Sequence, residues 1–169
     1  MSAVDPAAAD LARIVATEFR RRLLGEQLPR LRACVHQLGD EGVWRRPAPV
    51  CNSVGNLLLH LRGNTTQWIL ATFGAVDDAR NRPAEFAATE GASGAELVDA
   101  LAAVYTRACE LVDGLTVDEL RRERLVQGRY TETGLSAVLH VLEHCSGHAG
   151  QIYAWTKQAT GRDLRFYDL

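Results

Sequence analysis

The part of the sequence that decides the fold is residues 139–151, LHVLEHCSGHAGQ. Its apolar residues and its histidines recur every three or four positions, which is the period of an α-helix and not of a strand. His140, His144 and His148 follow one another at intervals of four residues. At about 100° per residue they span an arc of about 80°, so they lie on one face of one helix. This stretch therefore predicts a long helix that carries a row of imidazoles.

Capping residues and glycines mark the ends of this helix and of three others. The histidine-bearing helix is expected over residues 134–159, and Gly161 stands where a C-terminal cap belongs. Apolar residues at helical spacing, bounded by capping residues and a glycine, predict three further long helices over residues 6–38, 54–73 and 94–113.

The first of these helices has a clear start and an interruption. Asp5 and Pro6 form an N-cap followed by a proline in the first turn. Gly25 and Pro29 should kink or break the helix before it ends. Near the other end of the chain, residues 124–132 are too brief to assign to a helix or a strand.

Two connecting segments complete the organisation of the chain. Residues 39–52 form a connector in which two prolines oppose regular structure, and residues 74–93 form a long loop between the second and third helices. A loop of about 20 residues in a compact domain is unusual and often functional, so this one could cover a site. The pattern predicts an all-α fold, an antiparallel four-helix bundle that makes a single domain of residues 1–169.

Composition argues against several classes of function. The 169-residue chain carries a net charge of −2, so nothing indicates binding to nucleic acid or to an anionic membrane surface. No run approaches the roughly 18 to 20 apolar residues of a membrane span. The N-terminus also lacks the basic and apolar regions of a signal peptide. The four cysteines form no C-x-x-C pair, as expected of reduced thiols in a cytoplasmic protein.

A further histidine, His60, lies in the second expected helix within a polar strip made with Asn56, Asn64 and Gln67. Two histidines four residues apart place their imidazoles in reach of one metal ion, and a third imidazole from a neighbouring helix completes a three-nitrogen site. Zinc, nickel, iron and copper all accept imidazole. Three protein ligands leave a position open for water or substrate, which is typical of catalytic metal sites.

The residues alone leave open which pair of histidines would join His60. His140 and His148 lie about 12 Å apart along the helix axis, so one ion could hardly take all three without strain. The pair is either His140 with His144 or His144 with His148, and His144 belongs to both. Equal axial level, with the second and fourth helices parallel, favours His140 with His144.

Other residues near the histidines favour structural roles. Cys145 is about 100° round the helix from His144 and should face the core, and Glu143 lies off the histidine face on the other side. Trp68 and Trp155, at helical spacing, are more typical of core residues than of a platform for stacking a substrate. The simplest alternative to a metal site is a plain helical bundle with a buried histidine cluster.

Two motifs resemble those of a known superfamily. Residues 52–64, NSVGNLLLHLRGN, are similar to the second-helix signature of the DinB/YfiT-like metalloenzyme superfamily, and residues 143–151, EHCSGHAGQ, are similar to its fourth-helix signature. Residues 82–86, RPAEF, also resemble a loop of one uncharacterised branch of this superfamily. The similarity covers roughly residues 8–168, and the two helical motifs occur in the correct order and spacing.

The resemblance implies a four-helix bundle in a mirror variant of the up-and-down topology. It implies a divalent metal ion, zinc or nickel, held by His60, His144 and His148, which selects the pair that the axial estimate disfavours. His140 then becomes a pocket residue behind the ligands. Frequent homodimers and small-molecule substrates are also implied.

Three polar residues lie one turn, or nearly one turn, from an expected ligand and could orient imidazoles or contact substrate: Asn56, Asn64 and Gln151.

The superfamily fixes fold and metal better than reaction. Characterised relatives include transferases and isomerases that use low-molecular-weight thiols, and others are metal-dependent hydrolases or damage-inducible proteins. A bound ion would lower the pKa of a thiol or of water and so supply a nucleophile at neutral pH. We expect thiol S-transfer or thiol-dependent isomerisation, with hydrolysis or non-catalytic binding of metal or small molecules in a stress response as alternatives. The sequence assigns no catalytic acid or base.

Overall fold

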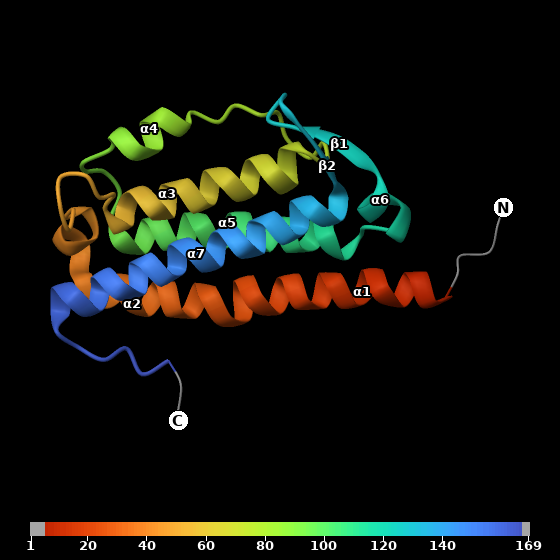
Figure 1. Cartoon of the computed structure of the whole chain (residues 1–169). Coiled ribbons are helices and arrows are strands. Elements are labelled where there is room, and N and C mark those ends of the chain that lie inside the picture. The colour runs from red at the N-terminus through yellow and green to blue at the C-terminus, as the bar shows by residue number, and fades with distance from the viewer. Residues whose placement is uncertain (1–5, 167–169) are drawn as a thin grey trace.

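Helices make up most of the structure, a computed structural model that describes residues 6–166 (Figure 1). In chain order the elements are α1 (Pro6–Arg20), the π-helical η1 (Arg21–Gln27), α2 (Leu28–Trp44), α3 (Val54–Thr65), the π-helical η2 (Thr66–Ala71), α4 (Arg82–Ala87), α5 (Gly94–Asp113), α6 (Val117–Arg121), β1 (Glu123–Val126), β2 (Tyr130–Thr133) and α7 (Gly134–Thr160). The expected N-cap at Asp5 lies outside the described residues.

The first long helix does not break at Gly25 and Pro29, and its helical backbone is interrupted at Gly39, where the sequence predicted its end. It continues through η1, where the N–H of Leu28 donates to the carbonyl of Leu23, five residues back. This wider π-helical turn lets the helix continue past Pro29, which has no N–H to donate. Gly39 takes a left-handed conformation, with φ of 65°, and helix then resumes as far as Trp44. The predicted connector therefore starts with a short second helix that reaches Trp44, and irregular backbone begins at residue 45.

A β-hairpin corrects the all-α expectation. Strands β1 and β2 pair antiparallel, with Glu123 opposite Thr133 and Val126 opposite Tyr130. Gln127 and Gly128 between them both have positive φ, which matches the right-handed twist of a hairpin. The sequence signal was weak because the turn uses Gln-Gly, whereas Asn-Gly or Asp-Gly is the strong indicator.

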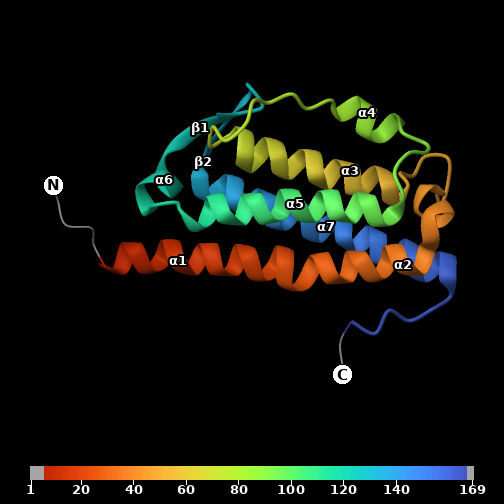
Figure 2. The ribbon, with the colours of Figure 1, turned by 180° about the vertical axis from the view of Figure 1, so that it is seen from behind.

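Helices α3 and α5 lie side by side and run in the same direction. Trp44 marks their common starting end, because its ring packs on Gly55 and its Nε1 donates to the carbonyl of Ala92, 3.1 Å away. At the other end, Arg107 of α5 donates to the carbonyl of Ala75, just beyond α3. The chain between them, residues 74–93, must therefore return along the whole bundle (Figures 1 and 2). We call it the crossover segment; it contains α4 and is not the plain loop that the sequence predicted.

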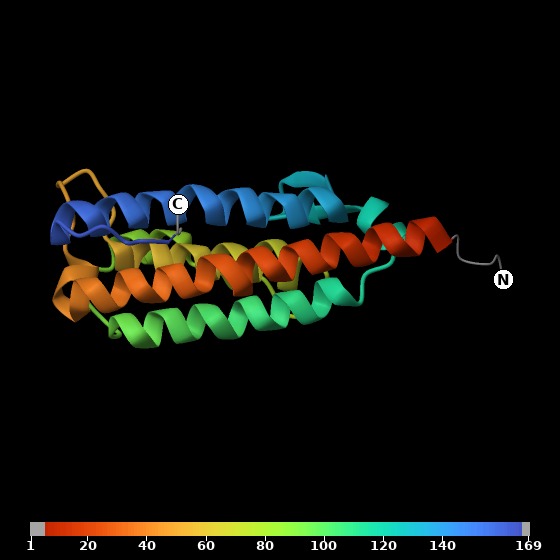
Figure 3. The same cartoon turned by 90° about the horizontal axis from the view of Figure 1, so that it is seen from below.

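Helix α7 runs antiparallel to α3. Its first residue, Gly134, lies against Phe73 just beyond the end of η2, and its last turns lie near Leu38 and Val54 at the other end of the bundle. The parallel directions that were expected for these two helices are therefore wrong. Viewed from below, α1 and α2 lie between α5 and α7 (Figure 3).

Apolar side chains from all the long helices fill the space between them. The largest fully buried ones include Phe19, Leu31, Leu57, Leu101, Tyr105 and Ile152. Among the described residues, no helix is long and apolar enough to cross a membrane.

Candidate metal centre

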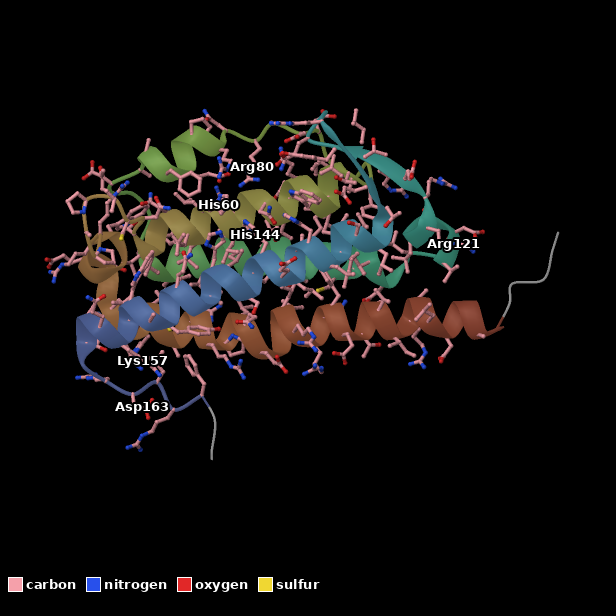
Figure 4. All side chains as sticks on the ribbon, viewed as in Figure 1. His60, Arg80, Arg121, His144, Lys157 and Asp163 are labelled. Carbon is pink, nitrogen blue, oxygen red and sulfur yellow. The ribbon has the colours of Figure 1, made fainter. Side chains whose placement is uncertain are left out.

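Three imidazoles from two helices converge near the middle of the bundle. His60 of α3 and His144 and His148 of α7 each offer a ring nitrogen, and these nitrogens all lie within 4.8 Å of one another. The Nε2 atoms of His60 and His144 are 3.0 Å apart. Figure 4 labels these two residues, which lie beside each other beneath Arg80. Such a group could hold a metal ion.

The antiparallel directions of α3 and α7 decide which histidines meet. Because the helices run oppositely, moving one turn forward from His60 to Asn64 corresponds to moving one turn back from His144 to His140. The Nδ2 of Asn64 accordingly lies 3.1 Å from the Nε2 of His140, and Trp68 stacks on the His140 ring at a centroid distance of 3.5 Å. His140 is thereby held beside the cluster and takes no part in it.

The crossover segment supplies the second nitrogen of His60 with a partner that the sequence analysis did not single out. The Oε2 of Glu85 lies 2.9 Å from the Nδ1 of His60. Arg80 binds the same carboxylate through two nitrogens, at 2.7 and 2.9 Å. All three side chains are at most 10% exposed. Arg80 and Glu85 come from a segment distant in sequence from both histidine helices, so spacing gave no signal for them.

This ion pair fixes the charge and the proton at the back of the site. Burial opposes ionisation of Glu85, but hydrogen bonds from Arg80 and His60 outweigh it and lower the pKa of the carboxyl. The ionised carboxylate accepts the Nδ1 proton of His60, which leaves the Nε2 lone pair free toward the cluster. The Nη2 of Arg80 is 3.0 Å from the same Nδ1, but a guanidinium only donates, so this contact is not a hydrogen bond when Nδ1 carries the proton, and Arg80 donates to Glu85 instead.

Close approach of the crossover segment to α3 depends on a glycine and on an asparagine. A Cβ atom at Gly63 would lie 2.1 Å from the Oε1 of Glu85, so any side chain there would push the ion pair away. Within the described structure, the side chain of Asn56 makes no hydrogen bond to a histidine. Its amide donates to the backbone carbonyls of Glu85 and Ala88, at 2.9 and 2.7 Å, while its oxygen completes the cap of α3. Asn56 therefore positions the crossover segment.

The imidazoles of α7 are neutral at pH 7. Burial lowers the pKa of His144 to about 3, with repulsion from His148 and His60 adding to the effect. Burial also lowers the pKa values of His140 and His148. Gln151 lies 3.2 Å from the Nδ1 of His148, and its Oε1 can accept that proton, so the Nε2 of His148 is free.

The donor set fits a divalent metal that accepts imidazole nitrogen. Three ring nitrogens lie within 4.8 Å of one another, and the Nε2 atoms of His60 and His144 are 3.0 Å apart. The Nδ1 of His144 is buried and has no hydrogen-bond partner among the described residues. A hollow of about 440 Å³ opens beside His144 and His148, which leaves room for a further ligand.

The two residues that flank His144 lie in different surroundings, Cys145 in the core and Glu143 at the rim of the hollow. Cys145 faces the core, as expected, where its sulfur lies 3.0 Å from the hydroxyl of the buried Tyr105. Glu143 lines the same hollow as His144, although the spacing had placed it off the histidine face. Its side chain is exposed at the rim.

Comparison with known proteins shows the family to which the chain belongs. The model of the mycothiol S-transferase family matches residues 21–156, which include all three histidines of the cluster. The chain belongs to this family. The match also confirms the resemblance to the DinB/YfiT-like superfamily.

A comparison with solved structures adds the fold alone. The crystal structure of a conserved protein from Enterococcus faecalis superposes with a TM-score of 0.68 at 18% identity, and the alignment covers 91% of this chain and 98% of that one. A comparison with curated proteins gave no significant match.

The lowered histidine pKa values predict that acid destabilises the metal-free protein as the pH falls below about 6.5. Unfolding returns each imidazole to its ordinary pKa. Below about pH 6.5 the unfolded chain therefore binds a proton at His144, whereas the folded protein binds it only near pH 3. The free energy of unfolding should therefore fall through this window. Chemical denaturation at pH 7.5 and 5.5 measures the loss, and His144→Gln should make it smaller.

The matched control for this experiment is His36→Gln, because His36 is exposed on α2. This variant should lose as much stability between the two pH values as the wild type does. An equal loss in His144→Gln and in the wild type would show that burial of His144 is not the cause.

Proposed function

We propose that this chain is a metal-dependent thiol S-transferase, and that His60, His144 and His148 are the ligands of its metal ion. The observation that carries the proposal is the set of three converging imidazoles beside an open hollow, in a chain of the mycothiol S-transferase family. The superfamily resemblance favours zinc or nickel as this ion, and both accept imidazole ligands and can keep a position for another ligand.

A divalent ion held by these rings would lower the pKa of a thiol in the hollow and keep it as a thiolate at neutral pH. The protein's own residues prepare the site for this role. Glu85 and Gln151 hold His60 and His148 with their Nε2 lone pairs facing inward, and the charge of Glu85 is balanced by Arg80. The hollow beside His144 and His148 admits the thiol and its reaction partner.

The transfer would join the sulfur of a low-molecular-weight thiol to an electrophilic carbon. The S–H bond is lost and a C–S bond forms, while the leaving group departs with its electron pair and the thiol proton passes to the solvent. A reversible addition of the same sulfur to a double bond would serve thiol-dependent isomerisation, which is the closest variant of this proposal.

The remaining expectations form part of the same proposal. Residues 1–169 make one domain, a four-helix bundle. The order of α1–α2, α3, α5 and α7 is up, down, down, up, which differs from the expected up-and-down topology because α3 and α5 are parallel. The protein acts on small molecules as a homodimer and does not bind nucleic acid. A cytoplasmic location agrees with four cysteines that are all free.

Two other functions use the same site. Water in place of the thiol would make the protein a metal-dependent hydrolase. A site that binds metal or a small molecule without turnover would suit a non-catalytic stress protein. The family supports the thiol reaction over both.

Incubation of the metal-loaded protein with mycothiol and monochlorobimane tests the proposal. We expect the thioether conjugate, measured by fluorescence and mass spectrometry, to form only with metal and thiol both present. His144→Gln should lower the rate by at least about 100-fold, because the variant loses a ligand, while His36→Gln should match the wild type. Ester or amide hydrolysis without thiol, and no conjugate, would favour the hydrolase.

Glu85→Gln should weaken zinc binding by about 10- to 100-fold, because the neutral amide no longer fixes the proton of His60 on Nδ1. Competition with a chromophoric chelator measures the affinity, and circular dichroism verifies that the variant is folded. The matched control is Glu90→Gln, an exposed carboxylate in the same crossover segment, which should keep the wild-type affinity. Equal affinities for all three proteins would remove Glu85 from the metal centre.

A further inference from the structure

A second hollow adjoins the histidine site on the side of the β-hairpin, and we call it the hairpin hollow. It has a volume of about 350 Å³ and lies between η2, the end of β2 and the first turns of α7. His140 and Glu143 line both this hollow and the one beside His144 and His148, so the two adjoin each other along α7. A molecule that reacts beside the histidines can therefore extend into the hairpin hollow.

The fold leaves two buried polar atoms beside His140 without partners. Trp68 forms part of the wall of the hairpin hollow and is 6% exposed, and its Nε1 has no hydrogen-bond partner among the described residues. The Oδ1 of Asn64, one turn earlier, is buried and unpaired in the same part of the structure. Native structures rarely leave such atoms unpaired unless a ligand or water completes them. A ligand oxygen that accepts from the Trp68 indole would supply the missing partner.

Two leucines give the hairpin hollow an apolar wall. Leu135 and Leu139 lie one turn apart on α7 and are 37% and 53% exposed, although both are large apolar side chains. A ligand with an apolar body would remove part of this surface from water, which favours binding.

The charges that line the hairpin hollow are all negative. Glu132 and Glu143 lie in its wall, and none of the lining residues in the described structure is a lysine or an arginine. Arg124, which is opposite Glu132 in the hairpin, lies 3.9 Å from Glu119, and Arg80 is held in its buried ion pair. An anionic ligand would meet two carboxylates and no free cation, so the hollow disfavours carboxylates and phosphates.

We propose that the hairpin hollow binds the body of the electrophile, and that this electrophile is a neutral, mainly apolar molecule with an acceptor oxygen, such as an aromatic nitro compound or a ketone. The inference rests on the proposed function, because the electrophilic carbon must reach a sulfur beside His144. The ring centroid of His140 lies 5.4 Å from that of His144 and 3.5 Å from that of Trp68, so one small molecule can reach from the histidine site to the indole.

Two chlorodinitrobenzenes test the selection by charge in the metal-loaded protein. 1-Chloro-2,4-dinitrobenzene is neutral, whereas 4-chloro-3,5-dinitrobenzoate carries a carboxylate. In both, the thiolate sulfur bonds to the ring carbon and chloride leaves with the electron pair of the C–Cl bond. With the same thiol, kcat/KM relative to the uncatalysed rate should be at least about tenfold higher for the neutral compound. The double variant Glu132→Gln, Glu143→Gln should reduce this preference by about threefold or more, while Glu110→Gln, exposed on α5, should keep it.

Leu139→Ser tests the apolar wall with the same neutral compound. Its KM should rise about fivefold, because the variant removes apolar surface from the hollow. The matched control is Leu11→Ser on α1, since Leu11 is 55% exposed and Leu139 is 53% exposed. This control should keep the wild-type KM.

Binding of the neutral naphthyl ketone prodan to the metal-free protein separates this inference from the proposed function. Dye fluorescence should report binding to the wild type that is weakened about tenfold in Leu139→Asp and about threefold in Trp68→Phe, which keeps an aromatic ring but lacks the N–H. Leu11→Asp should match the wild type, and circular dichroism verifies that each variant is folded.

This pattern of dye binding without any turnover would support the inference while the proposed function failed. Absence of dye binding to the wild type, or equal weakening in Leu139→Asp and Leu11→Asp, would overturn the inference even if a thiol conjugate formed. Equal relative kcat/KM for the two chlorodinitrobenzenes in the wild type would also overturn it.

Discussion

Two parallel helices that lie side by side cannot be joined by a short loop, and this constraint shapes the molecule. Because α3 and α5 run in the same direction, the chain between them must travel back along the bundle (Figure 1). That return brings α4 and the ion pair of Arg80 and Glu85 over His60. The topology thus completes the candidate site from a third segment of the chain, which neither histidine helix could do alone.

Electrostatics explains why the arrangement tolerates so many titratable groups. The buried carboxylate of Glu85 is balanced by Arg80, and the rings of α7 stay neutral because burial lowers their pKa values. Neutral imidazoles cost far less to bury than charged ones and keep their lone pairs for a ligand. The interior therefore holds a set of nitrogen donors at neutral pH without a surplus of charge.

Much of the fold was predictable because its helices carry strong local signals. Ser53, Ser93 and Thr133 cap α3, α5 and α7 with their side chains, as the capping patterns indicated, and Gly161 ends α7 in a left-handed conformation. The hairpin and α4 were missed, since each is short and depends on contacts made after the helices assemble. Helix direction was also wrong, because the pattern of one helix contains no information about the orientation of its neighbour.

The residues of the candidate site also fall into those with a local sequence signal and those that depend on contacts between distant segments. Local spacing put His140, His144 and His148 on one face of a helix, and the polar strip of the second helix indicated His60. The resemblance then selected His144 with His148 as the pair. Arg80 and Glu85 could not be found in this way, because they reach His60 from another segment and need the gap left by Gly63. Asn56 was selected for its distance from His60 along α3, yet its contacts are with the crossover segment.

The central claim is that three imidazoles share one divalent ion. X-ray absorption spectroscopy of the protein loaded with one equivalent of zinc tests it most directly. The account predicts three nitrogen neighbours at about 2.0–2.1 Å with the multiple scattering of imidazole, together with at least one non-protein oxygen or added thiol sulfur. A spectrum with protein sulfur ligands, or with fewer than two imidazoles, would contradict it.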